Sequence, residues 1–244
     1  MAVDDQEYRI LELMAQSKKP VGSGTLSVAL SQAGCKASEA TVGRILRNLD
    51  LKGFTDKVGR NGRLLTVKGS RRLAELRREK ERGVIAGELV RALSARGRDQ
   101  LVDVLNARRA IERETARLAA LNATYDEIEE MRAMIQEHQA HAQEGVISIS
   151  DDVNFHKLIA QASRNKILEA TVDLIRKDSQ LTPMLEFIRR QVKSRVGSDH
   201  SSILQAIEER APGRAELAMM NHMDNLIRDV MRYWAEFQQS PREA

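Results

Sequence analysis

The sequence has 244 residues, a length that fits two domains better than one small module. Apolar residues make up 42% of the chain but aromatic residues only 3%, which favours cores of packed helices over a β-sandwich or barrel. The single cysteine, Cys35, excludes an internal disulfide or a thiolate metal cage. With a polar, acidic N-terminus and no apolar run of about 18 residues, we expect a cytoplasmic protein without a membrane partner.

Positive charge is concentrated in the first third of the chain. Residues 1–83 hold 17 Lys and Arg against 10 Asp and Glu, a net charge of +7, whereas the remainder holds 22 against 25, a net charge of −3. This asymmetry predicts that the N-terminal part binds a polyanion such as DNA. A solvated basic surface without a binding partner would show the same excess of positive charge.

The N-terminal part begins with three predicted helices. Apolar spacing indicates a helix over residues 5–16, a second that Ser23 caps, and a third over residues 39–52 that Ser38 caps. The third has an apolar face and a polar face, and the polar face carries Ser38, Thr41, Arg44 and Asn48. Small polar residues followed by an arginine suit a helix that enters the major groove, although an ordinary amphipathic helix looks similar.

A predicted β-hairpin follows the third helix. Residues 54–58 and 63–67 are predicted to form two short strands, and the Asn61-Gly62 pair between them favours a type I′ turn. Lys57, Arg60 and Arg63 surround the tip, where they can contact DNA phosphates or a narrow minor groove. Helices followed by a basic hairpin indicate a winged helix-turn-helix that binds a double-stranded DNA operator.

The remainder of the chain is predicted to be helical throughout. A charged connecting helix over residues 71–82 is expected to end at Gly83. The predicted domains are therefore a winged helix at 1–68, a linker helix at 69–84 and an all-helical domain at 85–240. Within the last we expect an all-α bundle of six or seven helices, at about 86–95, 98–121, 124–143, 150–162, 165–189, 198–209 and 213–238. The predicted fold class is thus mostly α.

Histidines are candidate metal ligands in the helical domain. Asp152 and His156 are four residues apart and share one helix face, and His200 and His222 lie in two later helices. Three imidazoles and one carboxylate can bind a divalent metal ion in the core of a bundle. Spacing alone leaves open the alternative of buried histidines that only form hydrogen bonds. His138 and His141 form a competing pair, but their Gln- and Glu-rich surroundings are typical of a solvated face.

Four ordered motifs between residues 86 and 236 resemble the FadR-type C-terminal (FCD) domain of GntR-family regulators. The stretch from Asp152 to Asn165 resembles the Asp-x-x-Phe-His…Asn signature, and residues 108–120 are similar to the Arg-x-x-Ile-Glu…Leu-Ala-Ala helix. Residues 200–206 and 215–223 resemble the last two motifs. The predicted winged helix departs from the family, because it lacks the usual Leu-Pro-Ser-Glu-Arg segment. The operator preference of other family members therefore does not carry over to this chain. A second departure, Ala211-Pro212-Gly213 in the final turn, touches no expected ligand.

The resemblance implies a specific site and function. Asp152, His156, His200 and His222 would ligate a divalent metal ion, most naturally zinc, with nickel or manganese as alternatives. A small carboxylate effector would complete the metal's coordination, pair with Arg108 and have Asn165 nearby as polar support.

We therefore expect a homodimeric repressor, not an enzyme, whose operator binding changes when the carboxylate binds. A metal sensor, in which the ion itself is the effector, is the first alternative. A metallohydrolase is a remote alternative, because no motif supplies a general base beside the ligand pair.

Overall fold

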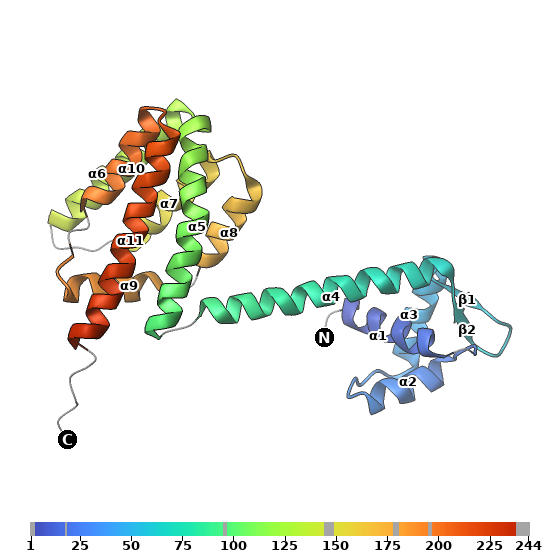
Figure 1. The fold of residues 1–244 in the computed structure, drawn as a ribbon. Coiled ribbons are helices and arrows are strands. Elements are labelled where there is room, and N and C mark those ends of the chain that lie inside the picture. Colours follow the sequence, from blue (N-terminus) through green and yellow to red (C-terminus); the bar gives the residue numbers. More distant parts are fainter. Residues whose placement is uncertain are drawn as a thin grey trace, which may run out of the picture. The chain divides into compact units, whose positions relative to one another are not determined.

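The computed structural model describes residues 3–17, 19–94, 97–143, 149–177, 181–194 and 197–237 (Figure 1). The chain divides into two compact units, one ending at Gly87 and one beginning at Glu88, and each has its own hydrophobic core. The predicted fold class is confirmed: a winged helix-turn-helix comes first and an all-α bundle follows. Within the described residues, no helix combines the length and apolar character needed to cross a membrane.

Three short helices form the body of the first unit. They are α1 (Val3–Gln16), α2 (Ser23–Gln32) and α3 (Glu39–Leu51), and they pack around buried side chains such as Leu11, Leu26 and Leu46. Ser38 caps α3 as predicted, because its hydroxyl accepts a hydrogen bond from the Thr41 amide. Ser23, by contrast, is the first residue of α2 and Gly22 is the cap residue; the Ser23 hydroxyl instead donates to Glu39.

The wing is a two-stranded antiparallel sheet, β1 (Thr55–Lys57) and β2 (Arg63–Leu65), in which Thr55 pairs with Leu65 and Lys57 with Arg63. The strands are shorter than expected, so the loop between them has five residues, 58–62, and not the four between the predicted strands. The expected type I′ turn is therefore wrong. The positive φ angles fall at Gly59 (54°) and Gly62 (115°), and the Val58 amide donates to the Gly62 carbonyl.

A backbone bridge anchors the wing to the segment before α2. Val21 and Arg63 exchange two backbone hydrogen bonds of 2.9 and 3.0 Å. The Val21 backbone therefore lies against Gly62, where an added Cβ atom would stand 2.4 Å from the Val21 carbonyl carbon. Only glycine fits this position.

The connecting helix α4 runs without interruption from Val67 to Leu93. The predicted end at Gly83 and the separate helix at 86–95 are wrong. A glycine inside a helix costs only about 1 kcal/mol relative to alanine, and the helix-forming residues on both sides offset that cost. Leu73 and Leu76, near the start of α4, belong to the core of the first unit.

The second unit consists of seven helices within the described residues. They are α5 (Arg98–Asn122), α6 (Tyr125–Gln143), α7 (Ile149–Ala162), α8 (Lys166–Arg176), α9 (Leu181–Gln191), α10 (Gly197–Glu208) and α11 (Pro212–Phe237). The long helices α5 and α11 lie side by side, with α7 and α8 against α5, and α10 in contact with α5, α6 and α11 (Figure 1). The predicted helix at 165–189 is in fact two helices. Pro183 lies in the first turn of α9, where a residue without an amide proton is tolerated.

Candidate metal centre

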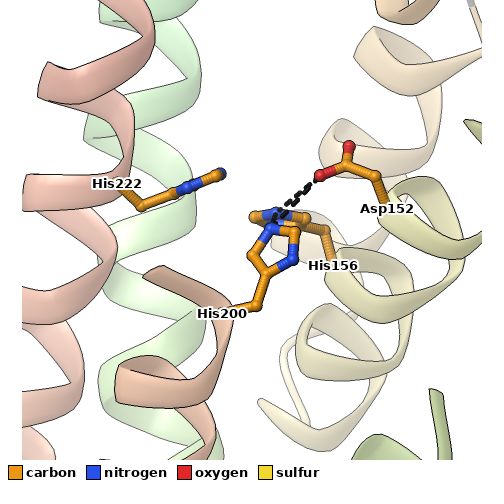
Figure 2. Close-up of side chains that lie close together, drawn as sticks. All are labelled: Asp152, His156, His200 and His222. Atoms are coloured by element: carbon orange, nitrogen blue, oxygen red, sulfur yellow. Dashed lines mark hydrogen bonds and ion pairs between the residues drawn. The ribbon is translucent and has the colours of Figure 1, made fainter. Parts of the chain in front are cut away.

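Four side chains from three helices meet inside the second unit (Figure 2). Asp152 and His156 project from α7, His200 from α10 and His222 from α11, and their ligand atoms all lie within 4.8 Å of one another. Each histidine is at least 94% buried. The i, i+4 spacing on α7 puts the first two side chains on one face, and packing of the three helices brings in the others.

The distances within this cluster are short. His200 Nε2 is 3.2 Å from Asp152 Oδ1 and 3.3 Å from His156 Nε2, and His156 Nε2 is 3.6 Å from Asp152 Oδ1 (Figure 2). His222 Nε2 is buried and has no hydrogen-bond partner among the described residues. One ring nitrogen of each histidine and one oxygen of Asp152 therefore lie close to a common point.

Two further carboxylates lie beside the outer ring nitrogens, although His156 Nδ1 forms no hydrogen bond of regular geometry. Glu112 Oε2 on α5 is 2.6 Å from His156 Nδ1, and Asp199 Oδ2 is 3.4 Å from His222 Nδ1. Asn225 steadies Asp199 by donating a 2.8 Å hydrogen bond. A carboxylate on the outer nitrogen fixes the tautomer and leaves the Nε2 lone pair free, which is the usual support for a metal-ligating histidine.

Two buried arginines adjoin the cluster on the side of Asp152. Arg108 Nε donates to Glu112 Oε1 at 2.7 Å, while Arg176 donates to Glu112 Oε2 and to Asp152 Oδ2, each at 2.9 Å. Arg108 Nη2 and Arg176 Nε are buried and form no hydrogen bond to a described residue. Two guanidinium groups thus balance the two carboxylates, with donors left over.

The burial of these groups shifts their ionisation. Burial lowers the pKa of His222 to about 4, and burial together with the Arg176 charge holds the pKa of His156 well below its usual value. Burial alone would raise the pKa of Asp152 and Glu112. The charge of Arg176 on Asp152, and of Arg108 and Arg176 on Glu112, reverses this and holds both pKa values well below the usual range. His156 and His222 are therefore neutral and both carboxylates are ionised at pH 7.

These residues fit a divalent metal ion. Imidazole nitrogens and one carboxylate oxygen form the donor set that zinc, nickel and manganese accept. The free His222 Nε2 atom is a buried polar group that a metal would satisfy. The sequence predicted all four of these side chains as one cluster, and the structure brings them together.

The structure places one of the two predicted effector residues beside the cluster and gives the other a capping role. Arg108 is buried next to the cluster through Glu112. Asn165 is the N-cap of α8, and its side chain accepts from the Ile167 and Leu168 amides, which is a structural role. An effector role for Asn165 remains a prediction. The side chains of His138 and His141 lie outside the described residues.

Sequence reasoning did not assign roles to the groups around the four ligands. Glu112 belongs to the quoted Arg-x-x-Ile-Glu motif, which was a usable signal. Arg176 and Asp199 carry no local signal, because their contacts depend on how α8 and α10 pack.

The predicted DNA-binding residues lie on α3 and the wing. Arg44 and Asn48 are exposed on α3, as are Lys57 and Arg60 on the wing, while Thr41 is half-buried and shares a hydrogen bond with Ser38. Arg47 is also exposed, one turn after Arg44; this residue was missed. Arg63 differs, because its Nε donates to both oxygens of Asp50 at 2.9 and 2.8 Å. It links β2 to the end of α3, and a DNA contact from it remains a prediction.

Comparison with known proteins identifies the family. The FCD domain model matches residues 103–225, half of the chain. The chain belongs to the FCD-domain family of GntR-type regulators.

Relatives of this FCD protein are regulators. It is 30% identical over 127 residues to the Exu regulon transcriptional regulator of Escherichia coli K12, covering 50% of this chain and 48% of that protein. It is 28% identical over 148 residues to the putative L-lactate dehydrogenase operon regulatory protein of the same organism, covering 59% and 57%. The chain thus spans about half the length of the curated relatives it matches. The solved structure of E. coli McbR/YncC shares the fold, with a TM-score of 0.50 at 15% identity over 94% of this chain and 95% of that one.

The first unit matches a different family model. Residues 8–73 match the ribonuclease R winged-helix domain. The match supports the winged-helix fold of the N-terminal unit.

Proposed function

We propose that this FCD protein is a DNA-binding transcriptional regulator whose operator binding is modulated by a small carboxylate at a metal site. The observation that carries the proposal is the cluster of Asp152, His156, His200 and His222, in which His222 Nε2 lacks a partner among the described residues. The native metal is proposed to be zinc, with nickel or manganese as alternatives of the same donor preference.

Charge balance favours an anionic effector. Glu112, Asp152 and Asp199 carry three negative charges against the two positive charges of Arg108 and Arg176, so a divalent ion leaves an excess of one positive charge at the site. A carboxylate reduces this excess and can accept hydrogen bonds from the unused Arg108 Nη2 donor. The name of one relative refers to an L-lactate dehydrogenase operon, and lactate is such a carboxylate.

The first unit is the proposed DNA-binding domain. The polar face of α3 and the tip of the wing present exposed cations, Arg44, Arg47, Lys57 and Arg60, on the part of the chain with the net positive charge. A homodimer would place two such domains on an inverted repeat. Regulation then requires a coupling free energy of about 1–3 kcal/mol between the effector site and the DNA site. Repression that the carboxylate relieves is the proposed direction.

Replacing a single ligand tests the metal and effector parts together. We expect His200→Ala to lose most of its bound metal and its response to carboxylates, while its affinity for DNA without effector stays within about twofold. Elemental analysis and fluorescence anisotropy with an operator selected from random duplexes measure both quantities. Gln205→Ala, an exposed position on the same helix, is the matched control. Unchanged metal content in His200→Ala would contradict the ligand set.

Measuring DNA affinity also distinguishes the proposal from the alternative of a metal sensor. If DNA affinity of the metal-free protein changes on metal addition alone, and no carboxylate adds to the change, the ion is the effector. A carboxylate response at constant saturating metal supports the proposal.

A further inference from the structure

Glu39 is an acidic residue at the start of α3, the helix whose polar face is proposed to contact DNA. Its side chain is exposed and forms no ion pair with a described residue, whereas Asp50, the other acid of α3, pairs with Arg63. An unpaired carboxylate on the DNA-binding face weakens binding to every sequence, because the phosphates repel it. At this position a carboxylate is useful only if it contacts a base.

The first turn of α2 holds the Glu39 carboxylate in place. The Ser23 hydroxyl donates a 3.0 Å hydrogen bond to Glu39 Oε1, and Oε2 has no hydrogen-bond partner among the described residues. Gly24 provides the room, because an added Cβ atom there would stand 3.3 Å from Glu39 Oε1. The free amides at the start of a helix favour a negative charge nearby. One oxygen is thus oriented, and the other can accept a hydrogen bond from outside the protein.

The residues that follow Glu39 leave the approach to it open. Glu39, Gly43 and Arg47 are spaced four residues apart and so form one row along α3. Ala40 and Arg44 form the adjacent row, so the two residues between the carboxylate and the exposed guanidiniums are small. A helix with small residues there can lie close to the base edges in the major groove. The N-terminal residues of a recognition helix are the ones that contact those edges.

Cytosine is the base whose major-groove edge suits a carboxylate. Its N4 amino group is a donor, whereas guanine presents two acceptors and thymine presents one acceptor and a methyl group. Adenine also has an amino group, but its N7 acceptor lies beside that group and repels a negative charge. A side chain that only accepts hydrogen bonds therefore favours cytosine and disfavours the other three bases.

We infer that Glu39 reads a cytosine in the operator, accepting a hydrogen bond from the N4 amino group through Oε2. Each half of the operator then carries a C·G pair at the N-terminal end of α3. This inference rests on the proposed function and adds a specificity-determining residue to its DNA-binding unit. The repulsion between Glu39 and other bases contributes to the selectivity, because it lowers the affinity for wrong sequences.

Operator selection from random duplexes tests the inference on the full-length protein. We expect the wild-type protein to select a C·G pair in each half-site, and Glu39→Gln to change the preference at this pair alone. Glutamine has the same size and can still accept from Ser23, but its amide is also a donor and suits adenine. In anisotropy titrations, replacing the selected C·G pair by A·T should weaken wild-type binding by about 10- to 100-fold and Glu39→Gln by less than about threefold.

Asp56→Asn is the matched control. Asp56 is exposed on β1 and forms no ion pair with a described residue, so this substitution removes the same charge from the same unit. Any gain in affinity that comes from charge alone appears in both variants. Only Glu39→Gln should change the preferred base.

The result for the wild-type protein distinguishes failure of the inference from failure of the proposed function. If the wild-type protein selects no preferred duplex, the proposed function fails and the inference fails with it. If it selects an operator but Glu39→Gln prefers the same bases at every position, the carboxylate only links α2 to α3 and the inference alone is overturned. A changed preference at a pair other than C·G would overturn it as well.

Discussion

Glu112 is the residue that connects most groups of the metal centre. One oxygen is 2.6 Å from His156 Nδ1 and accepts from Arg176, and the other accepts from Arg108. We expect Glu112→Gln to lower metal affinity by about 10- to 100-fold, because the amide no longer supports the His156 ring with a negative charge and leaves two guanidiniums less compensated. Competition with a chromogenic chelator measures this affinity.

The control for this substitution lies two residues further along α5. Glu114 is partly exposed and pairs with Arg117 on the surface, so Glu114→Gln should keep the metal affinity of the wild-type protein. Equal affinities in all three proteins would show that Glu112 does not support the ligand.

At the scale of elements, the wing depends on the contact between Gly62 and the Val21 backbone. We expect Gly62→Ala to destabilise the protein by about 2–4 kcal/mol, because the new methyl group meets the Val21 carbonyl and the φ of 115° disfavours alanine. Denaturant unfolding followed by circular dichroism measures the loss. Since the clash displaces the wing, DNA affinity should fall as well.

Gly59 offers a control in the same loop. Its φ is also positive, but nothing lies within 4 Å of an added Cβ atom. Gly59→Ala should therefore cost only the conformational strain, about 1 kcal/mol. Equal losses in the two variants would show that the Val21 contact does not matter.

At the scale of the whole molecule, the two units should respond differently to acid. All five histidines lie beyond residue 137, so the first unit has none. In the second, His222 has a pKa of about 4 and that of His156 is also lowered, whereas their unfolded values are near 6.5. The unfolded chain therefore binds more protons, and this stability is lost as pH falls from about 6.5 towards 4.

Calorimetry of the full chain in EDTA tests this expectation. Between pH 7 and pH 5.5 the unfolding temperature of the second unit should fall and that of the first should stay nearly constant. The lowered pKa values of Asp152 and Glu112 act only at lower pH, outside this interval. A fall of both transitions by equal amounts would contradict the assignment to the histidines.

Local signals in the sequence predicted the elements and the four clustered side chains. Helix periodicity placed Asp152 and His156 on one face of α7, whereas His200 and His222 were added by the resemblance of the ordered motifs to the FCD family. The Ser38 cap and the winged helix followed from equally local signals.

The errors had two causes, an exposed helix that continues past a glycine and a turn that tertiary contacts change. Gly83 was expected to end a helix that continues to Leu93, and Asn61-Gly62 was expected to form a tight turn that the Val21–Arg63 bridge replaces with a longer loop. Arg176 gave no signal, since a buried charge is recognisable only once its surroundings are known.

The bridge that Glu112 forms between His156 and Arg108 has a thermodynamic consequence for the proposed regulator. An acid that draws Arg108 towards itself would leave more of the Glu112 charge to the imidazole and so strengthen the bond between His156 and the ion. Binding linkage is reciprocal, so the ion would improve the affinity for the acid by the same factor. The concentration of acid needed for a half-maximal response would then depend on how much free metal surrounds the protein.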